Sequence, residues 1–325
     1  MKVLVTGGTG FVGSHLIDRL LARQVSVTAL VRSPARAAPL ERRGVRLIEG
    51  DLANHAALER AVRDQTIIYH VAALTGAVNE AELLHANRDG THRLVEAAEG
   101  AGTVSRFVLV SSAAAGGPAP RGVPKRDASA DRPLTMYGRS KLAAEAVVRA
   151  SPLPWTILRP PAVYGPRDTT NFLAIFRAIT RFGVAPVFGN GHQELSLIHV
   201  GDLAEACMVA AHCPGATGKV WYVNHPDPVT SRELLRAVGH AVGRSVRVLP
   251  LPAWATRGAL HITGAWARVL RRQTILHADK ANEFLAEAWT GDSTPFSASC
   301  GWHAGYSLEQ GLADTARWYR EERLL

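Results

Sequence analysis

The sequence has few cysteines, and its histidines and cysteines lack the spacings of common metal-binding motifs. Its 325 residues include three cysteines, Cys207, Cys213 and Cys300, at spacings that match no zinc motif. The 13 histidines form neither an H-x-H nor an H-x-x-x-H pattern. We therefore predict no metal site, and we expect three reduced, mostly buried thiols, which favours the cytoplasm.

Signal peptides and basic tracts are also missing. The first apolar strand is predicted to start at Lys2, which leaves no room for a signal peptide and again favours the cytoplasm. The net charge of +9 comes from scattered arginines, with no basic run interleaved with aromatic residues. We therefore expect no nucleic-acid partner, whereas an anionic cofactor suits this charge.

No apolar run is long enough to cross a membrane. The best candidate, residues 251–270, is interrupted by Arg257, His261 and Arg268, whereas a span needs about 20 nearly uninterrupted apolar residues. We favour a lid over an apolar substrate pocket for this segment. The alternative is an interfacial helix that makes peripheral membrane contact.

A glycine cluster near the N-terminus is the most informative feature that is present. The apolar run Lys2–Thr6 passes into Gly8, Gly10 and Gly13, which fit the G-x-G-x-x-G spacing, and then into a helical pattern. Such glycines allow a tight turn, close approach of backbone N–H groups to a diphosphate, and close packing of helix on strand. The sequence therefore predicts a dinucleotide site at a helix N-terminus.

The end of the second predicted strand indicates which dinucleotide binds. Residues 25–31 end without the acidic residue that would hold a ribose 2′-hydroxyl, and Arg32 and Arg36 follow. Guanidinium groups suit a 2′-phosphate, since each charged hydrogen bond contributes roughly 1.5–3 kcal/mol. NADP is therefore the favoured cofactor, and NAD is the alternative.

Apolar runs alternate with helical patterns, which predicts an α/β fold with a Rossmann-type, doubly wound parallel sheet. We predict a dinucleotide-binding domain over residues 1–165, to which residues 197–225 return. Residues 166–196 and 226–325 are predicted to form a smaller substrate-binding cap with the C-terminal helices. The predicted strands are 2–6, 25–31, 45–48, 67–71, 107–110, 155–158 and 220–223, and the predicted helices include 81–99 and 307–323.

A second motif carries acid–base chemistry. Tyr137 and Lys141 stand four residues apart and share one helix face, downstream of a strand that ends in Ser111 and Ser112. A lysine ammonium about 4 Å from a phenol lowers the phenol pKa toward neutrality. A serine hydroxyl then holds a substrate oxygen while the tyrosine gives or takes a proton.

These motifs together resemble the extended short-chain dehydrogenases/reductases, which include the NAD-dependent epimerases and dehydratases. The pattern is most similar to the branch of 3β-hydroxysteroid dehydrogenase-like enzymes. The motifs that carry the resemblance are Thr6-Gly-Gly-Thr-Gly-Phe-Val-Gly13, Gly50-Asp-Leu52, His70-Val-Ala-Ala73, Asn87-Arg-Asp-Gly-Thr91, Ser111-Ser112, Tyr137-Gly-Arg-Ser-Lys141, Arg159-Pro-Pro-Ala-Val-Tyr-Gly-Pro166 and His199-Val-Gly-Asp-Leu-Ala204.

The resemblance implies roles for individual residues. Ser112, Tyr137 and Lys141 are the implied catalytic residues, with Ser111 as an alternative to Ser112. Asp51 and Leu52 are implied to flank the adenine. The implied cofactor-binding residues are Gly7, Thr9, Gly10, Phe11, Val12, Gly13, Arg32, Arg36, Asp51, Leu52, Ala72, Ala73, Asn87, Tyr137, Lys141, Pro160 and Val163.

Departures from the family pattern narrow the activity. Residues 112–114 lack the Thr-Asp-Glu of the dehydratases, and Leu195 and Ser196 stand where nucleotide-sugar epimerases usually have an Arg-Asp pair. We therefore predict an NADP-dependent oxidoreductase that interconverts a ketone and a secondary alcohol on a hydrophobic small molecule. A nucleotide-sugar 4-epimerase with tightly bound NAD is the first alternative, with Arg268, Arg271 and Arg272 as substitute phosphate contacts, and a non-catalytic NADPH-binding sensor is the second.

Similar proteins pair through helices that correspond to residues 81–99 and 139–149. The resemblance therefore implies a homodimer.

Overall fold

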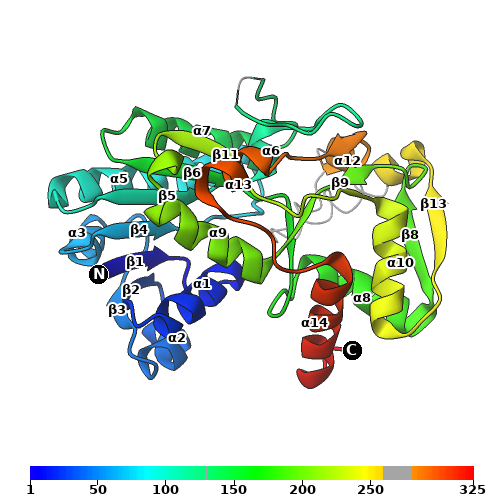
Figure 1. Cartoon of the computed structure of the whole chain (residues 1–325), viewed down its shortest axis with the longest axis horizontal. Helices are drawn as coiled ribbons and strands as arrows, with labels where there is room; N and C mark the ends of the chain where they lie inside the picture. The colour runs from blue at the N-terminus through cyan, green and yellow to red at the C-terminus, as the bar shows by residue number, and fades with distance from the viewer. Residues whose placement is uncertain (129, 259–279) are drawn as a thin grey trace.

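A seven-stranded parallel sheet forms the centre of the larger half of the molecule (Figure 1). The structure, a computed structural model, describes residues 1–128, 130–258 and 280–325. The strand order is β11-β6-β5-β4-β1-β2-β3. The strands are β1 (Lys2–Thr6), β2 (Ser26–Val31), β3 (Arg46–Glu49), β4 (Ile67–His70), β5 (Arg106–Val110), β6 (Trp155–Arg159) and β11 (Lys219–Tyr222).

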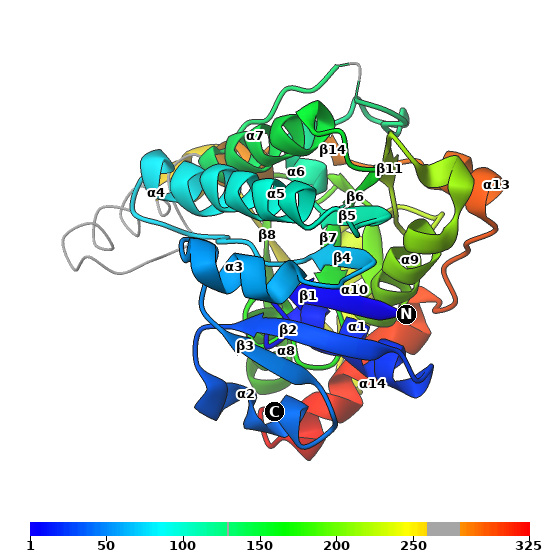
Figure 2. The ribbon, with the colours of Figure 1, turned by 90° about the vertical axis from the view of Figure 1, so that its left-hand side faces the viewer.

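Helices cover both faces of this sheet (Figures 1 and 2). One apolar cluster joins the sheet to α3 (His55–Val62), α5 (Gly90–Ala101) and α7 (Met136–Ala150). A second cluster joins the opposite face to α1 (Phe11–Ala22), α2 (Pro34–Glu41), α9 (Val200–His212) and α13 (Thr294–Cys300). A sheet buried on both faces needs continuous apolar strands, and the predicted α/β Rossmann-type fold is confirmed.

A smaller lobe, which we call the second lobe, has its own apolar core. Its main elements are α8 (Asn171–Phe182), β8 (Val184–Phe188), α10 (Ser231–Val242), β13 (Arg247–Leu251) and α14 (Leu308–Glu321). Capping boxes start two of these helices, Thr230 with Glu233 in α10 and Ser307 with Gln310 in α14. Strands β8 and β13 pair in parallel and form a ribbon at the edge of the lobe, far from the large sheet in Figure 1.

Short elements connect the two halves. The small strands are β7 (Ala162–Tyr164), β9 (Glu194–Leu195), β10 (Leu197–His199), β12 (Val229–Thr230) and β14 (Ala288–Trp289). The short helices are α4 (Glu80–Leu84), a π-turn (His85–Asp89), α6 (Ala113–Gly116), a 3-10 turn (Pro214–Ala216) and α12 (Lys280–Phe284). Phe296 of α13 and Trp302 lie in a core of the large sheet, so this part of the predicted cap packs on the sheet. The predicted domain bounds stay a prediction.

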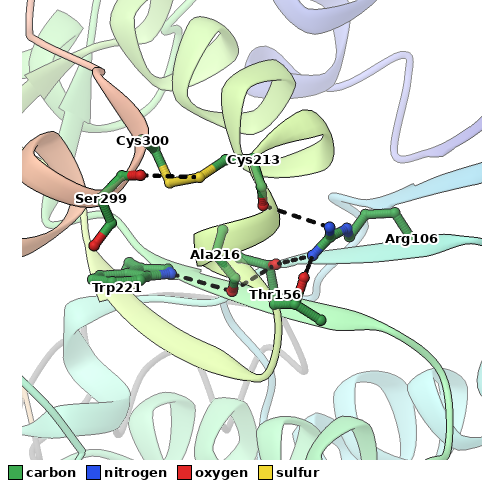
Figure 3. The surroundings of a disulfide bond; sticks show 8 residues. Arg106, Thr156, Cys213, Ala216, Trp221, Ser299 and Cys300 are labelled. Carbon is green, nitrogen blue, oxygen red and sulfur yellow. Dashed lines mark hydrogen bonds between the residues drawn. A yellow bond between two sulfur atoms is a disulfide. The ribbon is translucent and has the colours of Figure 1, made fainter.

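The expectation of three reduced thiols is wrong for two of them. Cys213 at the end of α9 and Cys300 at the end of α13 form a disulfide with an S–S distance of 2.19 Å (Figure 3). The third, Cys207, is a buried free thiol whose pKa burial raises to about 12. The two cysteines are 87 residues apart in the sequence, so no local spacing could predict that they form a disulfide.

The surroundings of the disulfide are tied together by hydrogen bonds (Figure 3). The Arg106 guanidinium donates to the Cys213 carbonyl oxygen at 3.5 Å and to the Thr156 hydroxyl at 3.3 Å. Trp221 donates its indole N–H to the Ala216 carbonyl oxygen at 3.3 Å. The disulfide thus attaches the end of α13 to the end of α9, beside these hydrogen bonds.

Candidate active site

The predicted site residues gather at one edge of the large sheet. Gly7 follows β1, Arg32 follows β2, Asp51 lies two residues after β3, and Ala72 lies two residues after β4. Ser112 and Pro160 likewise follow β5 and β6. Because the strands are parallel, all these positions lie at their carboxyl ends. The strand order reverses between β1 and β4, and ligands of doubly wound sheets bind at such a point.

The glycine turn leaves backbone exposed where a diphosphate would bind. Helix α1 starts at Gly10 without a side-chain cap, so the N–H groups of its first turn remain for an outside acceptor. A Cβ on Gly10 would meet only the Gly7 carbonyl oxygen, at 3.2 Å, and there is otherwise open space above the turn. A Cβ on Gly13 would lie 2.2 Å from the same oxygen, so helix and strand pack here at their closest. The turn therefore fits a dinucleotide.

Gly7 and Gly8 have different roles in the turn. The left-handed residue of the turn is Gly7, with φ +72°, and a Cβ there would lie 2.7 Å from the backbone nitrogen of Ala72. Gly8 has no positive φ, and its Cβ would meet the Ile17 side chain at 2.6 Å. The positive φ of the turn therefore falls on Gly7, and the lack of a side chain on Gly8 makes room for Ile17 of α1.

Arg32 and Arg36 lie at the start of α2 beside the predicted adenosine position. Both side chains are exposed, and in the described part of the chain neither guanidinium has a hydrogen-bond or ion-pair partner. Ser33 caps α2 and fixes the turn between them. The two arginines are therefore available to an outside anion.

Asp51 and Leu52 form the next loop. The Asp51 carboxylate accepts a hydrogen bond from the backbone N–H of Ala53 at 2.9 Å. Leu52 packs against Gly90, and its carbonyl oxygen accepts from Arg93 at 2.7 Å. The loop is thus held in place by α5.

His70 lies in a buried chain of hydrogen bonds that the sequence analysis did not assign. Its Nδ1 lies 2.7 Å from the Thr6 hydroxyl, and its Nε2 lies 2.9 Å from the Thr91 hydroxyl. Burial, with a smaller contribution from the Lys141 charge, lowers the His70 pKa to about 3. The ring is therefore neutral, and it fixes β1, β4 and α5 relative to one another. The Thr6 hydroxyl also accepts from the backbone N–H of Ala72 at 3.2 Å.

Asn87 holds the loop after β4. Its side-chain amide donates to the Leu74 carbonyl oxygen at 2.9 Å and accepts from the Leu74 N–H at 2.8 Å. The same amide donates to the Ser140 hydroxyl at 2.9 Å. It projects from the π-turn, a distortion that concentrates at functional sites, within the stretch predicted as one helix over 81–99. Asn87 thus fixes the backbone next to Ala72 and Ala73.

The structure brings Ser112, Tyr137 and Lys141 together. The Ser112 hydroxyl acts on the Tyr137 phenol, whose pKa it lowers, and Lys141 lies one helical turn further along α7. Ser111, the alternative serine, instead donates to a Glu145 carboxylate oxygen at 2.6 Å. Of the two serines, Ser112 therefore lies against the tyrosine. Pro160 is next to it, since its carbonyl oxygen accepts from the Ala113 N–H at 2.8 Å.

The predicted effect of Lys141 on the phenol is wrong for the protein alone. Burial raises the pKa of Tyr137 to about 12, the Ser112 hydroxyl lowers it, and the Glu283 carboxylate raises it. The Lys141 ammonium donates to the Val110 carbonyl oxygen at 2.9 Å, and burial lowers its pKa to about 8. In this state the phenol is neutral and the lysine charge is directed at the end of β5.

A buried ionic cluster supports this arrangement, and the sequence analysis missed it. Arg159, at the end of β6, is fully buried and donates to both Asp131 oxygens, at 2.6 and 2.7 Å. It also donates to both Glu145 oxygens, at 2.9 and 2.7 Å, and to the Tyr222 hydroxyl at 3.2 Å. Glu145 accepts from Ser111 as well, so the cluster fixes β5, β6, β11 and α7 around Ser112. The one available signal was an arginine at the end of an apolar strand.

Comparison with known proteins identifies the family. Residues 3–223 match the model of the NAD dependent epimerase/dehydratase family. The chain belongs to this family. The family includes NAD(P)-dependent enzymes of the extended short-chain dehydrogenase/reductase type, as the motifs had indicated.

Curated relatives extend over nearly the whole chain. A ceramide reductase of Caulobacter vibrioides is 33% identical over 321 residues, which cover 98% of this chain and 94% of that protein. A 4-hydroxy-2-methyl-3-oxo-4-farnesyl-3,4-dihydroquinoline-1-oxide ketoreductase of Stigmatella aurantiaca is 32% identical and covers 83% of this chain and 82% of its own. Among solved structures, MoeE5 in complex with UDP-glucuronic acid and NAD is 28% identical, with a TM-score of 0.79 over 99% of this chain and 100% of that chain.

Several predicted features lie outside the described residues. Residues 259–270 of the segment interpreted as a lid or interfacial helix are among them, as are Arg268, Arg271 and Arg272. Within the described ranges, we find no helix that combines the length and apolar character needed to span a membrane.

Proposed function

We propose that this protein is an NADP-dependent oxidoreductase that interconverts a ketone and a secondary alcohol on a hydrophobic small molecule. The observation that carries the proposal is the placement of Tyr137 and the buried Lys141 one helical turn apart on α7, with Ser112 close enough to act on the phenol. Ser112 follows β5, and the next residue, Ala113, bonds to Pro160, which the family resemblance implies binds the cofactor.

The chain's own residues supply binding and proton transfer. In the reducing direction, Ser112 donates a hydrogen bond to the substrate carbonyl oxygen, and Tyr137 gives its proton to that oxygen as negative charge develops. A phenol that is fully protonated at neutral pH suits this donor role. NADPH, when bound, supplies the hydride. We assign Lys141 the stabilisation of the anionic tyrosine after transfer, which requires its ammonium to turn from the Val110 carbonyl oxygen toward the phenol.

Cofactor choice is assigned to the two arginines after β2. Arg32 and Arg36 are exposed at the position where a ribose 2′-phosphate would lie, and the loop offers no acidic residue to a 2′-hydroxyl. Gly7, Thr9, Gly10, Phe11, Val12 and Gly13 would hold the diphosphate, Asp51 and Leu52 the adenine, and Ala72, Ala73, Asn87, Pro160 and Val163 the nicotinamide half. These roles remain proposals.

The names of two relatives support a hydrophobic substrate. One acts as a ceramide reductase and the other as a ketoreductase of a farnesyl-bearing quinoline oxide, and both of these molecules carry a long apolar chain. Glu283 of α12 acts on the Tyr137 pKa, so the segment that leads into the second lobe borders the site. We assign substrate selection to this border and to the second lobe.

The test combines a turnover assay with a search for the resident cofactor. Purified protein is denatured and any released nicotinamide cofactor is identified by mass spectrometry. NADPH and NADH oxidation is then followed with long-chain ketones. We expect little retained cofactor and turnover that prefers NADPH. Stoichiometric NAD together with turnover of UDP-sugars would instead support the 4-epimerase alternative. The similarity to MoeE5, whose structure contains UDP-glucuronic acid and NAD, is the reason to test UDP-sugars.

Cofactor binding without turnover on any ketone, alcohol or UDP-sugar would support the second alternative, an NADPH-binding sensor. The homodimer and cytoplasmic localisation also belong to this proposal. Light scattering that gives a monomer at micromolar concentration would remove the dimer.

A further inference from the structure

Three large apolar side chains are exposed along one edge of the second lobe. The exposed fractions are 68% for Phe182, 42% for Leu249 and 78% for Trp254. Single exposed apolar residues are ordinary, but three along one short ribbon form a patch. The rest of the described chain exposes only Met1 and Val123 among its large apolar residues.

The pairing of β8 with β13 places these residues on a common ribbon. The Arg247 N–H donates to the Gly183 carbonyl oxygen at 2.9 Å, which puts the start of β13 beside Phe182. Leu249 is paired with Pro186, and both are exposed. Trp254 follows three residues after Leu251, the last residue of β13. Strands β8 and β13 lie at the outer edge of the molecule in Figure 1.

The ribbon has two different faces. Ala185 and Val187 of β8 point into the core of the second lobe and are almost fully buried. Successive residues of a strand point to opposite faces, so Pro186 points outward, together with its exposed partner Leu249. The inner face holds the lobe together, and the outer face has no such role.

Charge on this part of the lobe has one sign. Residues 169–193 and 234–258, which contain α8, β8, β13 and most of α10, include six arginines and no aspartate or glutamate. The nearest acidic residues along the chain are Asp168, Glu194 and Glu233, and α14 adds Glu321 and Glu322 near its end. All six arginines are exposed: Arg177, Arg181, Arg236, Arg244, Arg247 and Arg257. One of them, Arg181, lies over the Phe182 ring at 5.5 Å.

We propose that this edge of the second lobe, with Phe182, Leu249 and Trp254 and the neighbouring Arg181 and Arg247, docks on the surface of an anionic lipid bilayer. Aromatic and apolar side chains enter the boundary between headgroups and acyl chains, while arginines bind lipid phosphates. A self-complementary dimer interface is disfavoured because two such faces would bring like charges together. The proposal stands on exposure and charge, and does not depend on the proposed reaction.

Vesicle sedimentation tests the proposal with the full chain. We expect binding to phosphatidylcholine vesicles that contain one third phosphatidylglycerol, weak binding to pure phosphatidylcholine, and release by high salt. Trp254→Ser with Phe182→Ser, and separately Arg181→Glu with Arg247→Glu, should each reduce the partition by about ten-fold or more.

Matched controls lie elsewhere on the surface. Val123→Ser removes an apolar side chain that is 58% exposed, and Arg63→Glu reverses an exposed charge on α3's end. Both controls should bind anionic vesicles like the unaltered chain. The single variant Leu249→Ser serves if a double variant fails to fold, as judged by its thermal unfolding.

Three results would overturn the proposal. One is the absence of binding to anionic vesicles. Another is binding that Val123→Ser or Arg63→Glu weakens as much as the ribbon variants do. The third is a concentration-dependent dimer that the ribbon variants dissociate. If the unaltered chain binds anionic vesicles but reduces no ketone, the result counts against the proposed function and not against membrane binding.

Discussion

Different kinds of interaction stabilise the two halves of the molecule. Around the sheet, buried polar groups bond across elements: His70 joins β1 to α5, and Arg159 joins β6 to α7 and to Asp131. In the second lobe, the hydrogen bonds of the buried Asp168 carboxylate in the described chain reach residues within four positions, and the core between the helices is apolar. Directional bonds fix the distances on which proton transfer depends, whereas apolar contacts tolerate changes of shape.

The largest expected effect removes chemistry from the rigid half without disturbing its geometry. Tyr137→Phe keeps the ring and deletes the proton donor, so turnover should fall by about 10²- to 10⁴-fold. Cofactor affinity should stay within a few-fold. Steady-state kinetics and a fluorescence titration with NADPH measure the two, and a variant that retains full turnover contradicts the proposed role of Tyr137.

Removing the central cation of the ionic cluster should strongly destabilise the half of the molecule around the large sheet. Arg159→Met leaves Glu145 and Asp131 without their main partner, and we expect the free energy of unfolding to fall by about 3–5 kcal/mol. Arg149→Met is the matched control, because Arg149 also donates to Glu145 but is partly exposed, and it should cost about 1 kcal/mol or less. If urea denaturation gives the same loss of unfolding free energy for both variants, the buried Arg159 contributes no more to stability than the partly exposed Arg149.

The matching change in the second lobe should weaken stability but not the site. Phe176 is fully buried and packs against Tyr319 with ring centroids 5.1 Å apart. Phe176→Leu should cost about 1–2 kcal/mol while NADPH affinity stays unchanged. A large loss of affinity in this variant would mean that the two halves are not as independent as their contacts indicate.

Cofactor preference should depend on two exposed side chains. Replacing Arg32 and Arg36 by Ala should weaken NADPH binding by about ten- to a hundred-fold and leave NADH binding nearly unchanged. Arg42→Ala, an exposed arginine at the other end of α2, is the control. If the variant loses the same affinity for NADPH and NADH, Arg32 and Arg36 do not bind the 2′-phosphate.

The smallest effect is a pH dependence. Burial lowers the pKa of Lys141 to about 8, so its positive charge is present at pH 7 and is largely lost by pH 9. Affinity for the anionic cofactor should therefore fall a few-fold across this interval, and Lys141→Met should abolish the change. A dependence that persists in Lys141→Met would have to come from another group.

Local patterns in the sequence predicted the sheet well. Each of the seven predicted strands lies within one residue of an observed one at either end, because strands buried on both faces are continuous apolar runs. The catalytic roles of Ser112, Tyr137 and Lys141, which the family motifs imply, stay a prediction. The glycine spacing did not say which of the adjacent Gly7 and Gly8 adopts positive φ, and in the structure it is Gly7.

Contacts between distant residues were beyond such patterns. Arg159 meets Asp131 across 28 residues and Cys213 meets Cys300 across 87, and neither pair has a local signal. The Lys141 ammonium was expected to act on the phenol, but its direction depends on where the carbonyl oxygen of Val110 lies. These features require the packed structure.

The disulfide turns a large part of the second lobe into a closed covalent ring. Helix α10, strand β13 and helix α12 lie between Cys213 and Cys300, whereas α8 and α14 lie outside this interval. A protease that cuts once between the two cysteines would therefore release nothing until the disulfide is reduced. The nicked protein would run as one band without reductant and as two bands with it.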